Sequence, residues 1–145
     1  MSQRIAFHDI ARDAIKIMLD MENYIRATSI DPKLRELIKI RVSQINGCAH
    51  CLDMHTKDAR KIGETEQRIY CVSAFGECAF YSQAEKAALE LAEHITLIST
   101  KQVPDELYNR VREHFDENQY TYLVFIINQI NSWNRLNIAM ATPVK

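Results

Sequence analysis

Apolar residues along most of this chain recur at intervals of three and four positions, the spacing of one face of an α-helix. Residues near 9–27 show the pattern first, in a stripe made of Ile10, Ala14, Ile17, Met18, Met21 and Ile25. Glycine and proline each occur only three times in 145 residues, too rarely for a protein made of many short strands and turns. The pattern therefore predicts an all-α protein.

Start and stop signals divide the chain into about six to seven helices. Asp31-Pro32 supplies an N-cap residue followed by proline at the first helical position, and the helix that it opens ends at Asn46-Gly47. Ser82 and Glu85 have the spacing of a capping box at the start of a later helix. The other predicted helices cover about 9–27, 48–63, 65–75, 104–115 and 120–139.

The bulk composition is that of a globular protein, with 47% hydrophobic and 26% charged residues. The length predicts a single domain over residues 1–145. A formal net charge of −1 gives no electrostatic basis for binding nucleic acid or an anionic membrane. The first residues lack the apolar core of a signal peptide, and no stretch is apolar enough to span a bilayer. We therefore expect a cytoplasmic protein, in which thiols are kept reduced.

The segment Cys48-Ala49-His50-Cys51-Leu52-Asp53-Met54-His55 concentrates the reactive side chains of the chain. Two thiols three positions apart can close a disulfide reversibly, and at the start of a helix one of them commonly has a lowered pKa. His55 follows Cys51 by four positions, so its ring lies on the same helix face and reaches the thiol directly or through one water. In a reducing compartment such a pair indicates thiol redox chemistry or metal binding.

Glu36 joins this group if the two helices that meet at Asn46-Gly47 form an antiparallel hairpin. Glu36 lies ten residues before Asn46, and His55 lies eight after Gly47, which places them about 15 Å and 12 Å from the turn. The two side chains then lie at nearly the same level, with Cys51 nearer the turn. His55 can take the proton of Cys51 while Glu36 orients the imidazole. Peroxide oxidises a thiolate to a sulfenic acid, and a nearby thiol converts this acid to a disulfide.

Glu36, eleven intervening residues, Cys48-x-x-Cys51 and three more residues to His55 resemble the core motif of the alkylhydroperoxidase D (AhpD)-like family, in the carboxymuconolactone decarboxylase superfamily. Further segments are similar to that family, so the resemblance covers most of residues 30–140: Leu34-Arg35-Glu36-Leu37-Ile38, Glu85-Lys86-Ala87-Ala88-Leu89 and Trp133-Asn134-Arg135-Leu136-Asn137. The resemblance implies an all-helical fold, a homotrimer or homohexamer, and a cysteine peroxidase or disulfide reductase activity. No cofactor and no metal ion are expected.

The resemblance also implies a role for each site residue. By position, Cys51 forms the sulfenic acid and Cys48 resolves it, His55 and Glu36 form the proton relay, and His50 is an accessory residue. The expected reactants are a peroxide and a reducing protein, namely a thioredoxin-like protein, a lipoyl protein or a peroxiredoxin. Family members that decarboxylate lactones generally lack the cysteine pair, which argues against that reaction here but leaves it as an alternative.

Other interpretations of the cysteines stay open. Cys71 and Cys78 bring the number of thiols to four, enough for a zinc site, but six residues separate them where zinc modules have a short hook. Core packing is their expected role. A redox-sensing module without turnover would keep the same fold. The identity of the attacking thiol is also open, because Cys48 lies nearest the helix N-terminus, whereas His55 and the family motif favour Cys51.

Overall fold

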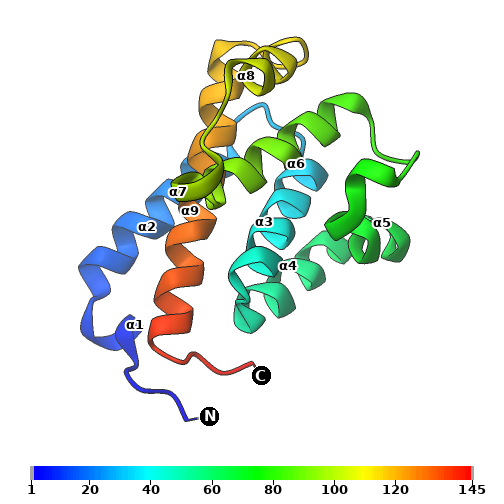
Figure 1. Ribbon diagram of the computed structural model, residues 1–145. Helices are drawn as coiled ribbons and strands as arrows, with labels where there is room; N and C mark the ends of the chain where they lie inside the picture. The colour runs from blue at the N-terminus through cyan, green and yellow to red at the C-terminus, as the bar shows by residue number, and fades with distance from the viewer. Residues whose placement is uncertain (1, 145) are drawn as a thin grey trace.

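The computed structural model describes residues 2–144, which form helices and connecting segments without any strand (Figure 1). This confirms the predicted all-α class. The elements in chain order are α1 (Phe7–Ile10), α2 (Arg12–Arg26), α3 (Pro32–Asn46), α4 (Ala49–Lys61), α5 (Glu66–Cys71), the 3-10 helix η1 (Val72–Glu77), α6 (Gln83–Thr96), α7 (Ile98–Lys101), α8 (Asp105–Arg112) and α9 (Glu117–Ala139). Within residues 2–144, every helix is too short or too polar to cross a membrane.

The described part of the chain holds more helices than the six to seven predicted, because some predicted segments are divided. The first is interrupted at Ala11, whose backbone angles of φ −109° and ψ 47° are not helical. The segment predicted over 65–75 is α-helical only to Cys71 and continues as η1. The last helix begins earlier than predicted, because Asp116 and Gln119 form a capping box that the sequence analysis did not recognise.

Helix α3 lies at the centre of the fold and packs against α4, α6 and α9 (Figure 1). Its start is fixed as predicted, since the Asp31 carboxylate accepts hydrogen bonds from the amides of Lys33 and Leu34 at 2.9 Å and 3.0 Å. Because α3 has neighbours on several sides, its buried residues include Glu36 and Lys39 as well as apolar side chains. A polar side chain in such a position needs a partner.

The turn between α3 and α4 forms the predicted antiparallel hairpin. Gly47 ends α3 with φ 70°, in the left-handed region that favours glycine. Cys48 follows as the N-cap residue of α4, and its sulfur accepts a hydrogen bond from the amide of Cys51 at 3.4 Å. The turn is tied to α9, because the side-chain amide of Asn46 donates to Asn131 and Asn134, at 3.0 Å each. The cysteine pair is thus held at the closed end of the hairpin.

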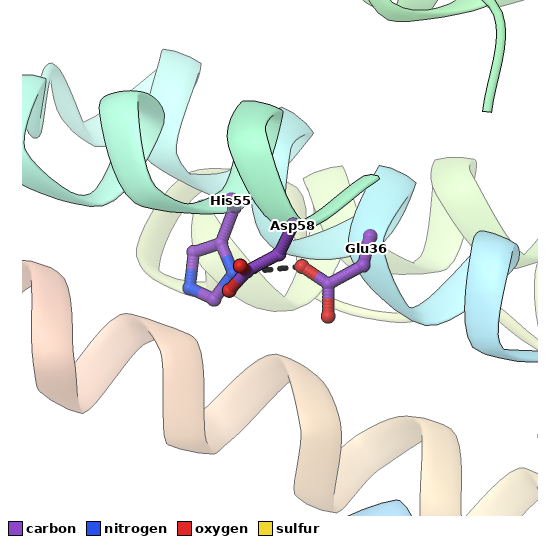
Figure 2. Close-up of side chains that lie close together, drawn as sticks. All are labelled: Glu36, His55 and Asp58. Carbon is purple, nitrogen blue, oxygen red and sulfur yellow. Dashed lines mark hydrogen bonds and ion pairs between the residues drawn. The ribbon is translucent and has the colours of Figure 1, made fainter. Parts of the chain in front are cut away.

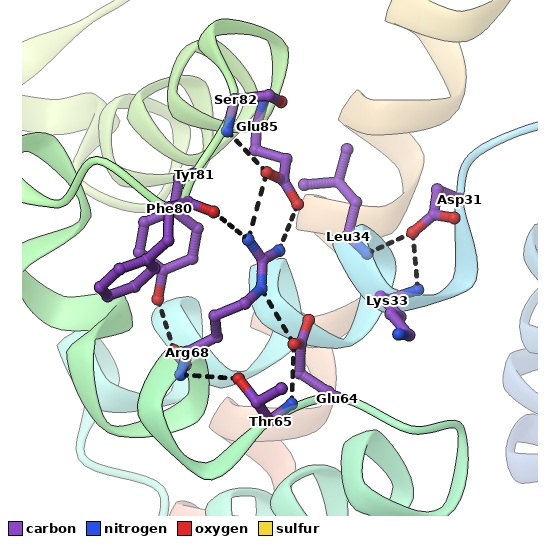
Figure 3. A network of polar contacts seen from close by, with 10 residues as sticks. All are labelled: Asp31, Lys33, Leu34, Glu64, Thr65, Arg68, Phe80, Tyr81, Ser82 and Glu85. Carbon is purple, nitrogen blue, oxygen red and sulfur yellow. Dashed lines mark hydrogen bonds and ion pairs between the residues drawn. The ribbon is translucent and has the colours of Figure 1, made fainter.

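A separate polar network secures the segment between α5 and α6 (Figure 3). Arg68 donates to Glu64 at 2.9 Å, to the carbonyl of Phe80 at 2.6 Å, and to Glu85. The hydroxyl of Tyr81 donates back to the carbonyl of Arg68. One guanidinium with several donors can serve two carboxylates and a carbonyl together. The network therefore holds α5 against the start of α6.

Candidate active site

The structure brings Glu36 and His55 together across the hairpin, at the level that their offsets from the turn predict. Nδ1 of His55 on α4 lies 2.8 Å from Oε2 of Glu36 on α3 (Figure 2). Both residues are buried, with 5% and 8% of their surface exposed. Because a carboxylate only accepts hydrogen bonds, Nδ1 carries the hydrogen and Nε2 is left as the basic nitrogen. This is the arrangement of an oriented general base.

Asp58 lies one turn after His55 and beside the same pair (Figure 2). One ligand atom from each of Glu36, His55 and Asp58 lies within 4.8 Å of the other two, so the three can hold a divalent ion if the Glu36–His55 hydrogen bond opens. In the described part of the chain, no other group of three His, Cys, Asp or Glu side chains is this close. Because the four cysteines do not converge, the geometry gives no support to a four-cysteine zinc site.

The sulfurs of Cys48 and Cys51 lie 2.6 Å apart. Both side chains are buried, with 1% and 0% of their surface exposed. A disulfide has a sulfur–sulfur distance of about 2.05 Å, so the pair is within about half an ångström of bonding distance. Reversible disulfide formation therefore needs very little movement of the backbone.

The two thiols differ sharply in acidity. The hydrogen bond from the Cys51 side chain lowers the pKa of Cys48 to about 6 although burial raises it, and the Cys51 amide and the charge of His50 lower it further. The same hydrogen bond and burial raise the pKa of Cys51, while Asn134 and Asn137 act in the opposite direction. Of the two thiols, Cys48 is therefore the more acidic and Cys51 the less acidic.

The two histidines of the motif have different surroundings. Nδ1 of His50 lies 3.0 Å from the carbonyl oxygen of Pro143 in the C-terminal segment, which holds the ring near Cys48. In residues 2–144, His55 has no hydrogen bond to either sulfur. The structure therefore shows no direct hydrogen bond of the kind that the sequence analysis allowed between His55 and Cys51.

Two hollows flank the motif. One of about 200 Å³ borders Glu36 and His55, and its other walls include Leu19, Met54 and Trp133. The other, of about 540 Å³, borders Cys48 and is formed with the C-terminal segment 141–144. His50 and Asn137 line both hollows, so they separate the relay side of the site from the Cys48 side.

Comparison with known proteins places the fold and the motif in a family. The model of the carboxymuconolactone decarboxylase family matches residues 12–94. The chain belongs to this family. The chain is 69% identical over 140 residues to the uncharacterized protein YdfG of Bacillus subtilis, covering 97% of this chain and 95% of YdfG.

Solved structures place it in the AhpD-like branch of the family. The protein of unknown function ATU0492 from Agrobacterium tumefaciens, for which a role as the antioxidant defence protein AhpD has been suggested, has a TM-score of 0.95 and 32% identity, with 99% of each chain covered. The debrominase Bmp8 has a TM-score of 0.82 at 20% identity, covering 94% of this chain and 74% of its own, and shares the fold.

Several residues at the site of this family member were missed by the sequence analysis. Asn131, Asn134 and Asn137 lie on one buried face of α9. Asn134 donates to the hydroxyl of Ser43 on α3 at 3.0 Å, and the amide nitrogen of Asn137 lies 3.6 Å from the sulfur of Cys51. Asparagines recur every three positions from Asn128 to Asn137, among the apolar residues of this helix, and that pattern could have identified them.

A buried ion pair was also missed. Nζ of Lys39 lies 2.7 Å from Oε2 of Glu22, and the indole nitrogen of Trp133 donates to the other oxygen of Glu22 at 3.0 Å. All three residues line the smaller hollow. His8 is exposed but stacks on Trp133 with 6.4 Å between ring centroids. These contacts join segments that are distant in sequence, so no local sequence pattern predicts them.

We expect the acidity of Cys48 to be visible in its alkylation rate. In a Cys71→Ser/Cys78→Ser variant, the rate with iodoacetamide should rise with pH through about 6 and level off above that, because only the thiolate reacts. A further Cys51→Ala change removes the largest cause of the shift, so the midpoint should move up toward the ordinary cysteine value of about 8.5. Mass spectrometry of the modified peptide measures the rate, and the urea-unfolded protein is the control. A midpoint near 8.5 with Cys51 intact would contradict the assignment.

Proposed function

We propose that this protein is a thiol-dependent peroxidase or disulfide reductase that reduces alkyl hydroperoxides through the Cys48–Cys51 pair. Membership of the carboxymuconolactone decarboxylase family supports an enzymatic, peroxidase-like or related role. The observation that carries the proposal is the pair of sulfurs at 2.6 Å in the same hairpin as a histidine hydrogen-bonded to a buried carboxylate. Two thiols at that separation, with a base one helical turn away, suit two-electron oxidation followed by disulfide closure.

In the first step, Cys51 attacks the terminal oxygen of the hydroperoxide. An S–O bond forms, the O–O bond breaks, and the sulfur is oxidised to a sulfenic acid while the peroxide is reduced to an alcohol. The proton of the Cys51 thiol passes to Nε2 of His55 and from there to the departing alkoxide. Glu36 stabilises the imidazolium that exists between these transfers.

In the second step, Cys48 resolves the sulfenic acid. Its low pKa keeps it a thiolate near neutral pH, so it can attack the sulfur of Cys51 without waiting for a base. The hydroxyl leaves and takes up a proton to form water, and the disulfide closes across the 2.6 Å gap. A reducing protein then returns the pair to two thiols. A thioredoxin-like protein, a lipoyl protein and a peroxiredoxin are the partner classes to test as electron donors or acceptors.

Single-cysteine variants test the proposal and identify the attacking thiol. With Cys48→Ser, one equivalent of alkyl hydroperoxide should leave a sulfenic acid on Cys51 that a dimedone-type probe labels. With Cys51→Ser, Cys48 should stay largely unlabelled at the same dose. The reverse pattern would show that the more acidic thiol, Cys48, and not the thiol one helical turn from His55, is the nucleophile. No label on either variant and no peroxide consumption by the wild type would overturn the peroxidase proposal.

The relay carboxylate should matter for rate more than for stability. Glu36→Gln keeps the shape of the side chain but removes its charge, so we expect the peroxidase rate to fall by roughly 10²–10⁴-fold. The matched control is Glu93→Gln, which breaks the part-buried ion pair between Glu93 and Arg41 away from the sulfurs. Stopped-flow kinetics and thermal unfolding of both variants give the two readouts. Wild-type turnover in Glu36→Gln would make Glu36 a structural residue only.

We also propose that the protein is a homo-oligomer, a trimer or hexamer. The apolar stripe predicted over 9–27 is only partly covered in a single chain, because Ile10 and Ile17 are 77% and 70% exposed. Tyr24, on the same face of α2, is 51% exposed and contacts the 40% exposed Phe125 of α9. Large apolar side chains exposed along α1, α2 and the adjoining part of α9 indicate contact with another surface. A second copy of the chain is the occupant that the AhpD-like resemblance implies.

Light scattering at micromolar concentration should give a mass that is three or six times 16.8 kDa. Ile17→Asp, which places a charge in the exposed face of α2, should shift the mass toward that of one chain. Tyr70→Ser is the matched control, because Tyr70 is as exposed as Ile17 but lies on α5. A wild-type mass near 17 kDa would contradict the proposal.

A further inference from the structure

Two asparagines of α9, Asn134 and Asn137, contribute hydrogen bonds that lower the pKa of Cys51, and of the two Asn137 is the one that also lines the hollow beside His55. Its amide nitrogen lies 3.0 Å from the carbonyl oxygen of Trp133 and 3.6 Å from the sulfur of Cys51. The residue is 6% exposed. Its amide oxygen is buried and has no hydrogen-bond partner among the described residues. The nitrogen of the Asn137 carboxamide thus faces the Cys51 sulfur, while its oxygen has no hydrogen-bond donor among the described residues.

The orientation of this carboxamide is fixed by chemistry. If the nitrogen and oxygen were exchanged, the amide oxygen would face the carbonyl oxygen of Trp133 at 3.0 Å, and two acceptors would repel each other. The nitrogen therefore faces Trp133 and Cys51, and the oxygen stays without a partner. An unpaired buried acceptor is unfavourable for folding, and such groups in a native structure call for an explanation.

A hydroperoxide supplies the group that this oxygen needs. An alkyl hydroperoxide carries one O–H, on the terminal oxygen that the thiol attacks, and an alkyl group that favours apolar walls. Asn137 borders the smaller hollow, whose apolar lining is made of Leu19, Met54 and Trp133. The rest of the lining is polar or charged and includes the relay pair and the charged side chains Glu22, Arg26, Lys39 and Asp58. The carboxamide, the base and apolar surface therefore meet at one hollow of about 200 Å³.

We propose that Asn137 is a catalytic residue that holds both reactants, with its amide nitrogen donating to the sulfur of Cys51 and its amide oxygen accepting from the terminal O–H of an alkyl hydroperoxide. This rests on the proposed function, with Cys51 as the attacking thiol. As the S–O bond forms and the O–O bond breaks, the thiol proton leaves through His55 to the alkoxide. The hydroxyl that remains on sulfur keeps its hydrogen bond to Asn137. The residue therefore stabilises the thiolate before attack and the sulfenic acid after it.

The test compares two buried amides of α9 in a Cys48→Ser background. Asn137→Leu keeps the branching of the side chain but removes its donor and its acceptor. Gln129→Leu is the matched control, because Gln129 is also buried and its amide donates to the carbonyl of Met18 at 2.9 Å, with no contact to sulfur. Three quantities are measured for each variant: the thermal unfolding midpoint, the alkylation rate of Cys51 by iodoacetamide, and the rate of sulfenic acid formation with cumene hydroperoxide.

We expect the two substitutions to change the unfolding temperature in opposite directions. Asn137→Leu should unfold at or above the temperature of its parent, because it removes an unpaired buried acceptor, whereas Gln129→Leu should unfold at a lower temperature because it leaves a carbonyl unpaired. Asn137→Leu should slow alkylation roughly tenfold through loss of one hydrogen bond to a charged sulfur, and should slow sulfenic acid formation roughly a hundredfold through loss of two. Gln129→Leu should leave both rates of the folded protein unchanged.

The outcomes separate this inference from the proposed function. Unchanged alkylation in Asn137→Leu overturns the role of Asn137 at the sulfur. Equal slowing of alkylation and peroxide reaction overturns its role in holding the peroxide. If the Asn137-containing parent forms no sulfenic acid with any peroxide, the peroxidase proposal fails, and with it the peroxide-holding role. Slower alkylation in Asn137→Leu would then still establish the donor role. A lowered unfolding temperature with unchanged rates makes Asn137 a structural residue.

Discussion

The site depends on the burial of α3, which forces each polar side chain buried on that helix to find a partner on a different neighbour. Glu36 pairs with His55 of α4, Lys39 with Glu22 of α2, and Ser43 with Asn134 of α9. In a low-dielectric interior an unpartnered charge is very costly, and removing one member of such a pair typically costs about 3–5 kcal/mol. These three contacts therefore fix how α2, α4 and α9 are placed around α3, and the same contacts form the walls of the site.

The difference in acidity between the two cysteines sets their separate roles in the proposed cycle. Each half of the proposed cycle needs a thiolate, first on Cys51 and then on Cys48. Cys48 is the N-cap of α4 and accepts a hydrogen bond from the amide of Cys51, and its pKa is lowered to about 6. Cys51 has a raised pKa and needs a base at the moment of attack. The more acidic thiol thus suits resolution, which then needs no separate deprotonation, and the less acidic thiol lies in the helix that carries His55.

Local physics explains which features the sequence could predict. The cap at Asp31, the left-handed Gly47 and the equal offsets of Glu36 and His55 are determined within a single hairpin, so spacing and helix geometry are enough to place them. No glycine or proline lies at the helix break at Ala11, so no sequence pattern predicted that break. The contact of Asn137 with Cys51 joins residues 86 positions apart. Periodicity shows that such a residue faces inward, but it does not show which helix it will meet.

The sequence could not predict which of the two cysteines is the more acidic, and the reason is a different one. It depends on a sulfur–sulfur distance of 2.6 Å and on the direction of the hydrogen bonds around it, and neither follows from the Cys-x-x-Cys spacing. A helix N-terminus alone is worth about 0.3–1 kcal/mol at exposed sites. A pKa lowered from 9.0 to about 6 requires more than that, because one pKa unit corresponds to about 1.4 kcal/mol. The hydrogen bond with Cys51 is the largest cause of the lowered pKa, so each cysteine affects the acidity of the other.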